Sequence, residues 1–229
     1  VWLVMTILVA HVASVNAVFK PTTKEELMAA INVCLANVAS GVQCCSVSPY
    51  CYRIDINDGS TVTDDIGDWD TSLITDMSSL FYMTSFNADI SQWNTSQVTD
   101  MQDMFMSNLA FNKPLGSWDT SKVTNMGAMF AGAAAFNQAI SSWDTSKVPM
   151  IYLEDMFYGA TAWQARYTNC GDSSSHSACS EFTSYANSGW SGDGPPAAWV
   201  RKDNACDAAV PPANGAAGDC TDTLASGST

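Results

Sequence analysis

The chain has 229 residues, enough for one elongated domain with end caps. Its 23 Asp and Glu against 9 Lys and Arg give a formal net charge of −14 at pH 7. This charge argues against nucleic acid or an anionic membrane surface as a partner, and it favours solubility and basic partners.

Residues 1–17 form an apolar segment, VWLVMTILVAHVASVNA, without Lys, Arg, Asp or Glu. Val15 and Ala17 fit the small-x-small pattern that precedes a signal cleavage site, which predicts a mature chain starting at Val18. The alternative is a retained membrane anchor, but a membrane span needs about 20 apolar residues. The segment lacks an initiator Met and a positive n-region, so we expect the sequence to be part of a longer chain.

Residues 18–65 are predicted to form a helical, cysteine-containing N-terminal cap. The stretch TKEELMAAINVCLANVA has a capping box formed by Thr23 and Glu26. Its apolar face predicts that Cys34 points inward, together with Leu27, Ile31 and Val38.

The acidic stretch DINDGSTVTDD follows this helix and superficially resembles a calcium loop. An EF-hand needs Gly at position six and Glu at position twelve. Counted from Asp55, Gly59 is fifth and Ile66 is twelfth, so both positions fail. We interpret the stretch as an acidic turn that joins the cap to the repeats.

Residues 66–168 contain four copies of one motif. The copies open with Trp69, Trp93, Trp118 and Trp143, at steps of 24, 25 and 25 residues, a fixed period typical of stacked repeats. Each copy continues with a large apolar residue and Phe, and then with a second aromatic residue that is followed by Asn or Gln. The fourth copy carries two extra residues before Phe157, as terminal repeats often do.

Apolar residues within each copy recur at helical spacing. In the second copy these are Val98, Met101, Met104, Phe105 and Ala110. The segment FNKPLGSW that follows is too short and broken for a helix, and it is predicted to be extended. We therefore expect an α/β repeat solenoid, leucine-rich-repeat-like, with a short strand and a short helix in each coil and with end caps stapled by disulfides.

The repeated pattern Trp-Asp-Thr-Ser-x-Val-Thr-x-Met-x-x-Met-Phe-x-x-Ala-x-x-Phe-Asn resembles the bacterial surface protein repeat of the BspA-like leucine-rich-repeat family. The resemblance covers residues 66–165. It departs from the pattern at Leu80, at Pro149 and at the insertion in the fourth copy. Members of that family are secreted or surface-anchored and are linked to adhesion, so the resemblance implies partner binding.

A polar ladder repeats once in each copy, at Asp70, Asn94, Asp119 and Asp144, each followed by Thr and Ser. These oxygens are predicted to cap helices and to satisfy backbone groups between copies. The alternative is a flat polar face that binds a partner or cations. Asn94-Thr95-Ser96 is also an N-x-[ST] sequence, which makes Asn94 a candidate glycosylation site.

All eight cysteines lie outside the repeats, and their even number in a chain with a secretory leader predicts disulfides. Four on one side allow three pairings, which the sequence leaves open. Their spacing does not fit a zinc knuckle. The candidates are Cys34, Cys44, Cys45, Cys51, Cys170, Cys179, Cys206 and Cys220.

After the repeats, residues 169–205 are rich in Ser, Gly, Ala and Pro and are predicted to form an irregular C-terminal cap. Residues 206–229 resemble the opening of a cysteine-paired module related to sushi domains, cut off before its next cysteine. His176 is the only histidine after residue 17, and a hydrolase built on it is a third hypothesis. GWSGD around Ser191 lacks the last Gly of a G-x-S-x-G elbow, which disfavours it.

We therefore expect a secreted or cell-surface repeat protein that binds a protein or glycan and is not an enzyme. It is expected to need no cofactor and no metal, and to touch a membrane only through an uncleaved N-terminal segment. The alternative is a structural subunit of a surface layer or membrane-attached assembly, held by that segment.

Overall fold

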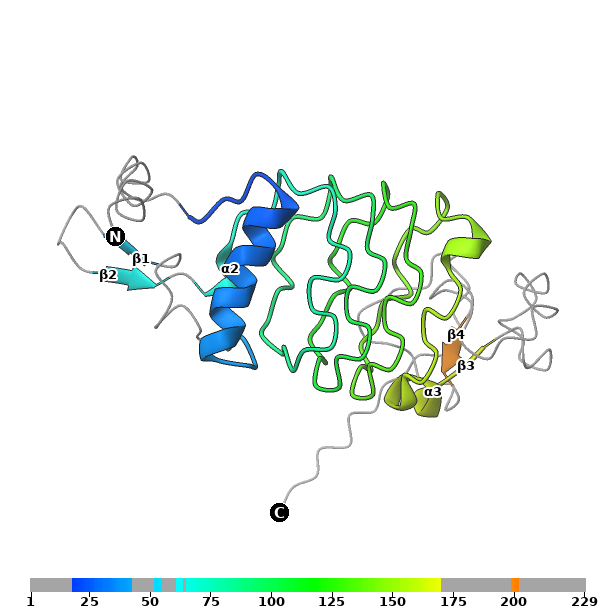
Figure 1. Cartoon of the computed structure of the whole chain (residues 1–229). Coiled ribbons are helices and arrows are strands. Elements are labelled where there is room, and N and C mark those ends of the chain that lie inside the picture. The colour runs from blue at the N-terminus through cyan, green and yellow to red at the C-terminus, as the bar shows by residue number, and fades with distance from the viewer. Residues whose placement is uncertain (1–17, 43–51, 55–60, 64, 170–198, 202–229) are drawn as a thin grey trace, which may run out of the picture.

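The computed structural model describes residues 18–42, 52–54, 61–63, 65–169 and 199–201, and Figure 1 shows the four copies as neighbouring turns of one stack. None of the described helices has the length and hydropathy to cross a bilayer. The elements in chain order are α2 (Lys24–Asn37), β1 (Tyr52–Ile54), β2 (Thr61–Thr63), η3 (Ile66–Asp68), η4 (Met150–Tyr152), α3 (Thr161–Arg166), β3 (Tyr167–Asn169) and β4 (Trp199–Arg201).

Backbone hydrogen bonds from one copy to the next hold the repeats together. In copy 2, which begins at Trp93, the amides of Met101, Asp103 and Phe105 donate to carbonyls 24 residues further along the chain, each at 2.9 Å. Equivalent donors join copy 1 to copy 2 and copy 3 to copy 4. Because every second amide takes part, all four copies lie in one register.

The expected α/β repeat solenoid is wrong, because residues 69–160 contain no α-helix and no strand. Apart from η4 and two isolated bridges, Asp76 to Asp100 and Asp100 to Asn125, these residues form turns and irregular backbone. The segment 111–118, expected to be extended, forms no strand.

Residues with a left-handed backbone conformation explain why no helix forms, although the apolar residues recur at helical spacing. An α-helix requires φ near −63° at every position, and each copy has two residues of positive φ, four apart. Val98, Met101, Met104 and Phe105 are nevertheless fully buried, because successive turns bring them to the core. The positive-φ residues are Ser79, Met83, Asp103, Ser107, Ala128, Gly132, Asp155 and Gly159.

Two columns of aromatic rings fill the core. One column contains Phe81, Phe105, Phe130 and Phe157, whose neighbouring ring centroids lie 5.4–5.9 Å apart. The second contains Phe86, Phe111, Phe136 and Trp163. Within each copy the two rings are nearly parallel, 3.8–4.4 Å apart. Each aromatic ring therefore packs on a ring of the same copy and on its equivalents in the adjacent copies.

The tryptophans that open copies 2 to 4 donate hydrogen bonds to carbonyls earlier in the chain. The indole N–H of Trp93 donates to the Ile66 carbonyl, that of Trp118 to Ile90 and that of Trp143 to Leu115, at 2.7–3.1 Å. The indole nitrogen of Trp69 is buried without a hydrogen-bond partner in the described part of the chain, where no earlier copy stands before it.

The N-terminal cap packs on copy 1 through α2. Thr23 caps this helix as predicted, since its hydroxyl accepts the Glu26 amide at 3.2 Å, but the Glu26 carboxylate reaches Thr22 rather than Thr23. The buried face comprises Leu27, Ala30, Ile31 and Cys34. Just before α2, Phe19 meets the ring of Trp69 edge-on, with centroids 4.9 Å apart.

The C-terminal end is closed in a similar way. After α3, strand β3 pairs antiparallel with β4, and this pairing brings Trp199 back to copy 4. The Trp199 ring meets Phe157 edge-on at 5.3 Å. A ring from outside the repeats thus lies edge-on against Trp69 of copy 1 and another against Phe157 of copy 4, and each covers apolar surface that a further copy would otherwise cover.

The remaining expectations concern the ends of copy 1 and copy 4. Strand β1 precedes the acidic stretch 55–65 and pairs antiparallel with β2, which lies within it; residues 55–60 and 64 of the stretch lie outside the described part. The two-residue insertion of copy 4 falls at η4, whose residues are all exposed. Register is regained at once, because the Met126 amide donates to the Tyr152 carbonyl.

Candidate interaction surface

The polar ladder closes one short turn in every copy. Each side-chain Oδ1 accepts the backbone N–H of the serine two residues further on, at 2.9–3.1 Å. Asn94, Asp119 and Asp144 are exposed, whereas Asp70 is half-buried. The ladder therefore faces outward and caps turns rather than helices.

The threonines beside the ladder point inward. Thr71, Thr95 and Thr120 are at most 2% exposed, and each hydroxyl donates to the carbonyl of the ladder residue in the next copy at 3.0 Å. In copies 1 to 3 the motif thus combines an acceptor on the outer side with a buried donor that bonds to the next copy.

Two lysines of the N-terminal cap pair with two carboxylates of copy 1, those of Asp70 and Asp76. Lys20 lies 2.7 Å from Asp70 and lowers the pKa of that carboxyl to about 2, with help from Ser72. Lys24 bonds to Ser78 and lies 3.0 Å from Asp76. Burial raises the pKa of Asp76, but the bonds from Ser78 and Lys24 outweigh that effect and leave it below its usual value.

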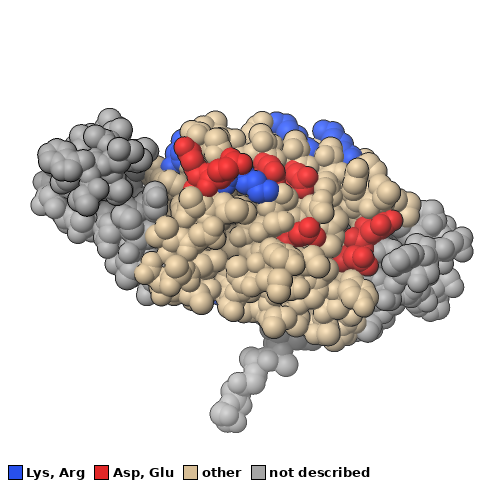
Figure 2. Space-filling view, viewed as in Figure 1, with Lys and Arg blue, Asp and Glu red and all other residues tan. Residues whose placement is uncertain are grey.

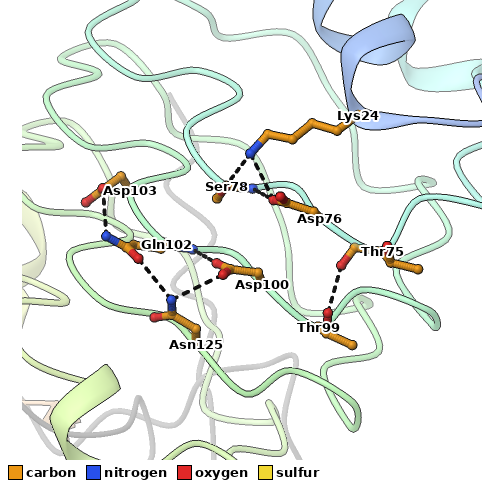
Figure 3. A network of polar contacts seen from close by, with 9 residues as sticks. All are labelled: Lys24, Thr75, Asp76, Ser78, Thr99, Asp100, Gln102, Asp103 and Asn125. Atoms are coloured by element: carbon orange, nitrogen blue, oxygen red, sulfur yellow. Dashed lines mark hydrogen bonds and ion pairs between the residues drawn. The ribbon is translucent and has the colours of Figure 1, made fainter.

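A second polar row, formed by Asp76, Asp100 and Asn125, crosses the first three copies (Figure 3). The Asn125 amide nitrogen donates to Asp100 at 3.2 Å and to Gln102 at 3.0 Å. At this position copies 1 and 2 hold carboxylates and copy 3 holds the neutral amide of Asn125. This amide joins copy 3 to copy 2 and adds no further negative charge beside Asp100. Its bonds within the chain give this row a structural role.

The outer carboxylates of the ladder remain ionised well below neutral pH. Hydrogen bonds from the hydroxyl and amide of Ser121 lower the pKa of Asp119, and those from Ser146 lower the pKa of Asp144. Such carboxylates are poor general acids near pH 7, where they carry no proton. They add fixed negative charge to an exposed edge.

A third row is internal. The amides of Asn112 and Asn137 donate to the side-chain oxygens of Asn87 and Asn112, at 3.0 and 2.9 Å. The Asn137 oxygen is buried and has no partner among the described residues, because the next equivalent amide, that of Gln164, bonds within α3. The row ends where α3 begins.

Sequence reasoning missed an exposed apolar row along the turns. Equivalent positions of the four copies hold Tyr82, Met106, Ala131 and Tyr158, joined by cross-copy backbone bonds from Met83 to Met106, Ser107 to Ala131 and Gly132 to Tyr158. Tyr82, Met83, Leu109 and Tyr158 are between 44% and 68% exposed. We call Tyr82, Met83, Met106, Leu109 and Tyr158 the apolar row.

The apolar row lies in segments without charge. Between the two aromatic residues of each copy, the sequences YMTS, MSNLA, AGAAA and YGATA contain no Asp, Glu, Lys or Arg. Figure 2 shows charged groups over the upper and middle parts of one face and none over its lower part. The sequence therefore contained a signal for the apolar row, since the loop between the two aromatic residues is uncharged in all four copies.

Several predicted residues lie outside the described part, namely Cys44, Cys45, Cys51, Cys170, Cys179, Cys206, Cys220, His176 and Ser191. Cys34 is fully buried and disulfide-bonded. Within the described ranges, no three His, Cys, Asp or Glu side chains come close enough together to hold a metal ion.

Comparison with known families gives a match over the repeats. The family described as "Mycoplasma protein of unknown function, DUF285" matches residues 55–170, just over half of the chain and the whole of the repeat stack. Neither the curated proteins nor the solved structures gave a match.

Proposed function

We propose that this chain, which belongs to the family described as Mycoplasma protein of unknown function, DUF285, is a non-catalytic module that binds a protein partner through the apolar row. The observation that carries the proposal is the set of large apolar side chains left in solvent on uncharged loops. Met83, Leu109 and Tyr158 are each more than 60% exposed.

The side chains of the apolar row are of the kinds found in protein interfaces. Tyr and Met are enriched at the cores of protein interfaces, where charged residues are depleted. The cross-copy hydrogen bonds fix the spacing of the row, so that little backbone ordering is needed on binding. At the equivalent position of copy 3, Ala131 and Gly132 place no large side chain between Met106 and Tyr158.

We also propose that this chain is related to the BspA-like surface proteins. The repeated motif resembles the BspA-like surface proteins, and we infer that this chain acts outside the cell as they do. A disulfide at Cys34 supports that compartment, because disulfides persist in oxidising surroundings. Fractionation of the source cells tests it, since recovery of the chain in the reducing cytosol would contradict it.

A screen of the full chain against purified extracellular proteins and glycans tests the binding proposal. For each bound partner, Met83→Asp with Leu109→Asp should weaken binding at least tenfold. Asp tolerates the left-handed backbone of Met83, as Asp103 and Asp155 already do. The control, Gln92→Asp with Gln97→Asp, adds the same charge at exposed positions outside the row and should leave binding unchanged. Loss in the control with none in the row variant would contradict the proposal.

A further inference from the structure

We propose that Asn94 is an acceptor site for an N-linked glycan. The inference does not rest on the proposed binding function. The N-x-[ST] motif alone is a weak signal, and the local geometry at residues 94–96 carries the argument.

The asparagine is presented outward on a closed turn. Asn94 is exposed, and its Oδ1 accepts two hydrogen bonds from Ser96, from the amide at 3.1 Å and from the hydroxyl at 2.7 Å. The amide nitrogen Nδ2 makes no hydrogen bond to any described residue. The group that would carry the glycan is therefore the free one, while the oxygen is held.

The middle residue of the motif keeps this orientation fixed. Thr95 is 2% exposed, and its hydroxyl donates to the Asp119 carbonyl of copy 3. With Thr95 turned into the stack, the Asn94 side chain points to solvent, where a bulky glycan meets no packing. Because the Asx turn involves only three residues, it can also form before the copies assemble.

Transfer of the glycan uses the unbonded Nδ2 of Asn94 and the Oδ1 that Ser96 holds. The co-substrate is an oligosaccharide linked to a lipid pyrophosphate. Nδ2 attacks the anomeric carbon, the C–O bond to phosphate breaks, and the lipid pyrophosphate leaves with the electron pair. The Nδ2 proton passes to a base of the transferase. The Ser96 hydroxyl bond to Oδ1 stabilises the charge that develops on oxygen as Nδ2 loses its proton.

The other copies supply the matched controls. Asp70, Asp119 and Asp144 hold the same turn with a carboxylate, so Asn94→Asp makes copy 2 resemble its neighbours and removes the acceptor. Ser96→Ala keeps the backbone bond of the turn and removes only the hydroxyl. Asp119→Asn, placed in the Asn94→Asp background, moves the motif to copy 3, where Thr and Ser already follow position 119.

The full chain is expressed behind a secretion signal in a eukaryotic host, and its intact mass is measured before and after glycosidase treatment. The wild-type chain should lose the mass of one glycan, and Asn94→Asp and Ser96→Ala should lose none. The relocated motif should regain it. Translation into microsomes, read as a gel shift, gives the same test without secretion. Translocated wild-type chain without a glycan would overturn the proposal, whether or not the relocated motif is modified.

Discussion

Left-handed backbone at ordinary residues is the feature of single positions that most determines each copy. Ser79, Asp103 and Ala128 have φ between 50° and 59°. A side chain in this region costs about 1–2 kcal/mol relative to glycine, because Cβ approaches the neighbouring carbonyl oxygen. The cost is tolerated because the same conformation aims alternate amides at the next copy.

Ala128→Gly should therefore leave the free energy of unfolding unchanged or raise it by up to about 1 kcal/mol. Relief of the left-handed strain offsets the added flexibility of the unfolded chain, which costs about 0.4–1 kcal/mol. Ala134 lies six residues further on and has a negative φ, so it has no such strain to relieve. Ala134→Gly should therefore lower the free energy of unfolding by the full 0.4–1 kcal/mol, about the cost of the added flexibility. Denaturant unfolding of both variants measures the difference, and equal losses would show that Ala128 is not strained.

The Lys20–Asp70 pair makes a pH-dependent prediction. The folded pKa of Asp70 is about 2, below the unfolded value of about 3.9. The pair's contribution is therefore fully present above pH 4 and is lost as the pH falls to about 2. It is below about 1 kcal/mol, because both side chains are more than a third exposed.

An NMR titration of the Asp70 carboxyl carbon checks this directly. Lys20→Met should raise the midpoint toward the usual value for Asp. Asp119, which is bonded to its own serine and lies two copies away, should keep its midpoint and so serves as the internal control. A wild-type midpoint near 3.9 would refute the lowered pKa of Asp70.

Sequence patterns predicted the buried side chains of a copy better than its backbone. The spacing of Val98, Met101 and Met104 correctly indicated one buried face. It could not distinguish a helix from a series of turns, because glycine marks the left-handed positions only at Gly132 and Gly159, in copies 3 and 4. Met83 was missed as a surface residue because it lies only two residues after the core residue Phe81.

At the scale of an element, each copy depends on its aromatic pair. Phe130 is fully buried and stacks on Phe136, Phe105 and Phe157. Phe130→Ala should lower the free energy of unfolding by about 3–5 kcal/mol, through lost burial and the cavity left behind. Tyr158→Ala, at a residue 61% exposed, should change it by less than about 0.5 kcal/mol. A thermal melt that scarcely responds to Phe130→Ala would mean that the ring column is misassigned.

For the whole molecule, stability depends on both end caps. Cys34 lies on the face of α2 that covers copy 1, and it is disulfide-bonded. Cys34→Ala should cost about 2–5 kcal/mol, the usual range for removing a native disulfide from a small domain. Thermal unfolding with and without reductant checks this. Reductant should lower the melting temperature of the wild-type chain more than that of the variant, and an equal response would contradict a stabilising role for this bond.

The whole-molecule prediction from sequence was right about repetition and wrong about its form. The tryptophan period located the four copies, since a shared period needs no knowledge of backbone angles. The predicted short strand and helix are absent, and a helix would have kept its backbone hydrogen bonds within one copy. The structure directs them between copies, as from Phe105 to Met129.

That bond gives the most direct test of the repeat stack. NMR couplings transmitted through hydrogen bonds identify the carbonyl that each amide contacts. The structure predicts a coupling between the Phe105 amide nitrogen and the Met129 carbonyl carbon, with equivalents from Phe81 to Met104 and from Phe130 to Met156. A coupling from Phe105 to the Met101 carbonyl, four residues earlier, would reveal a helix within the copy and contradict the cross-copy register on which the apolar row depends.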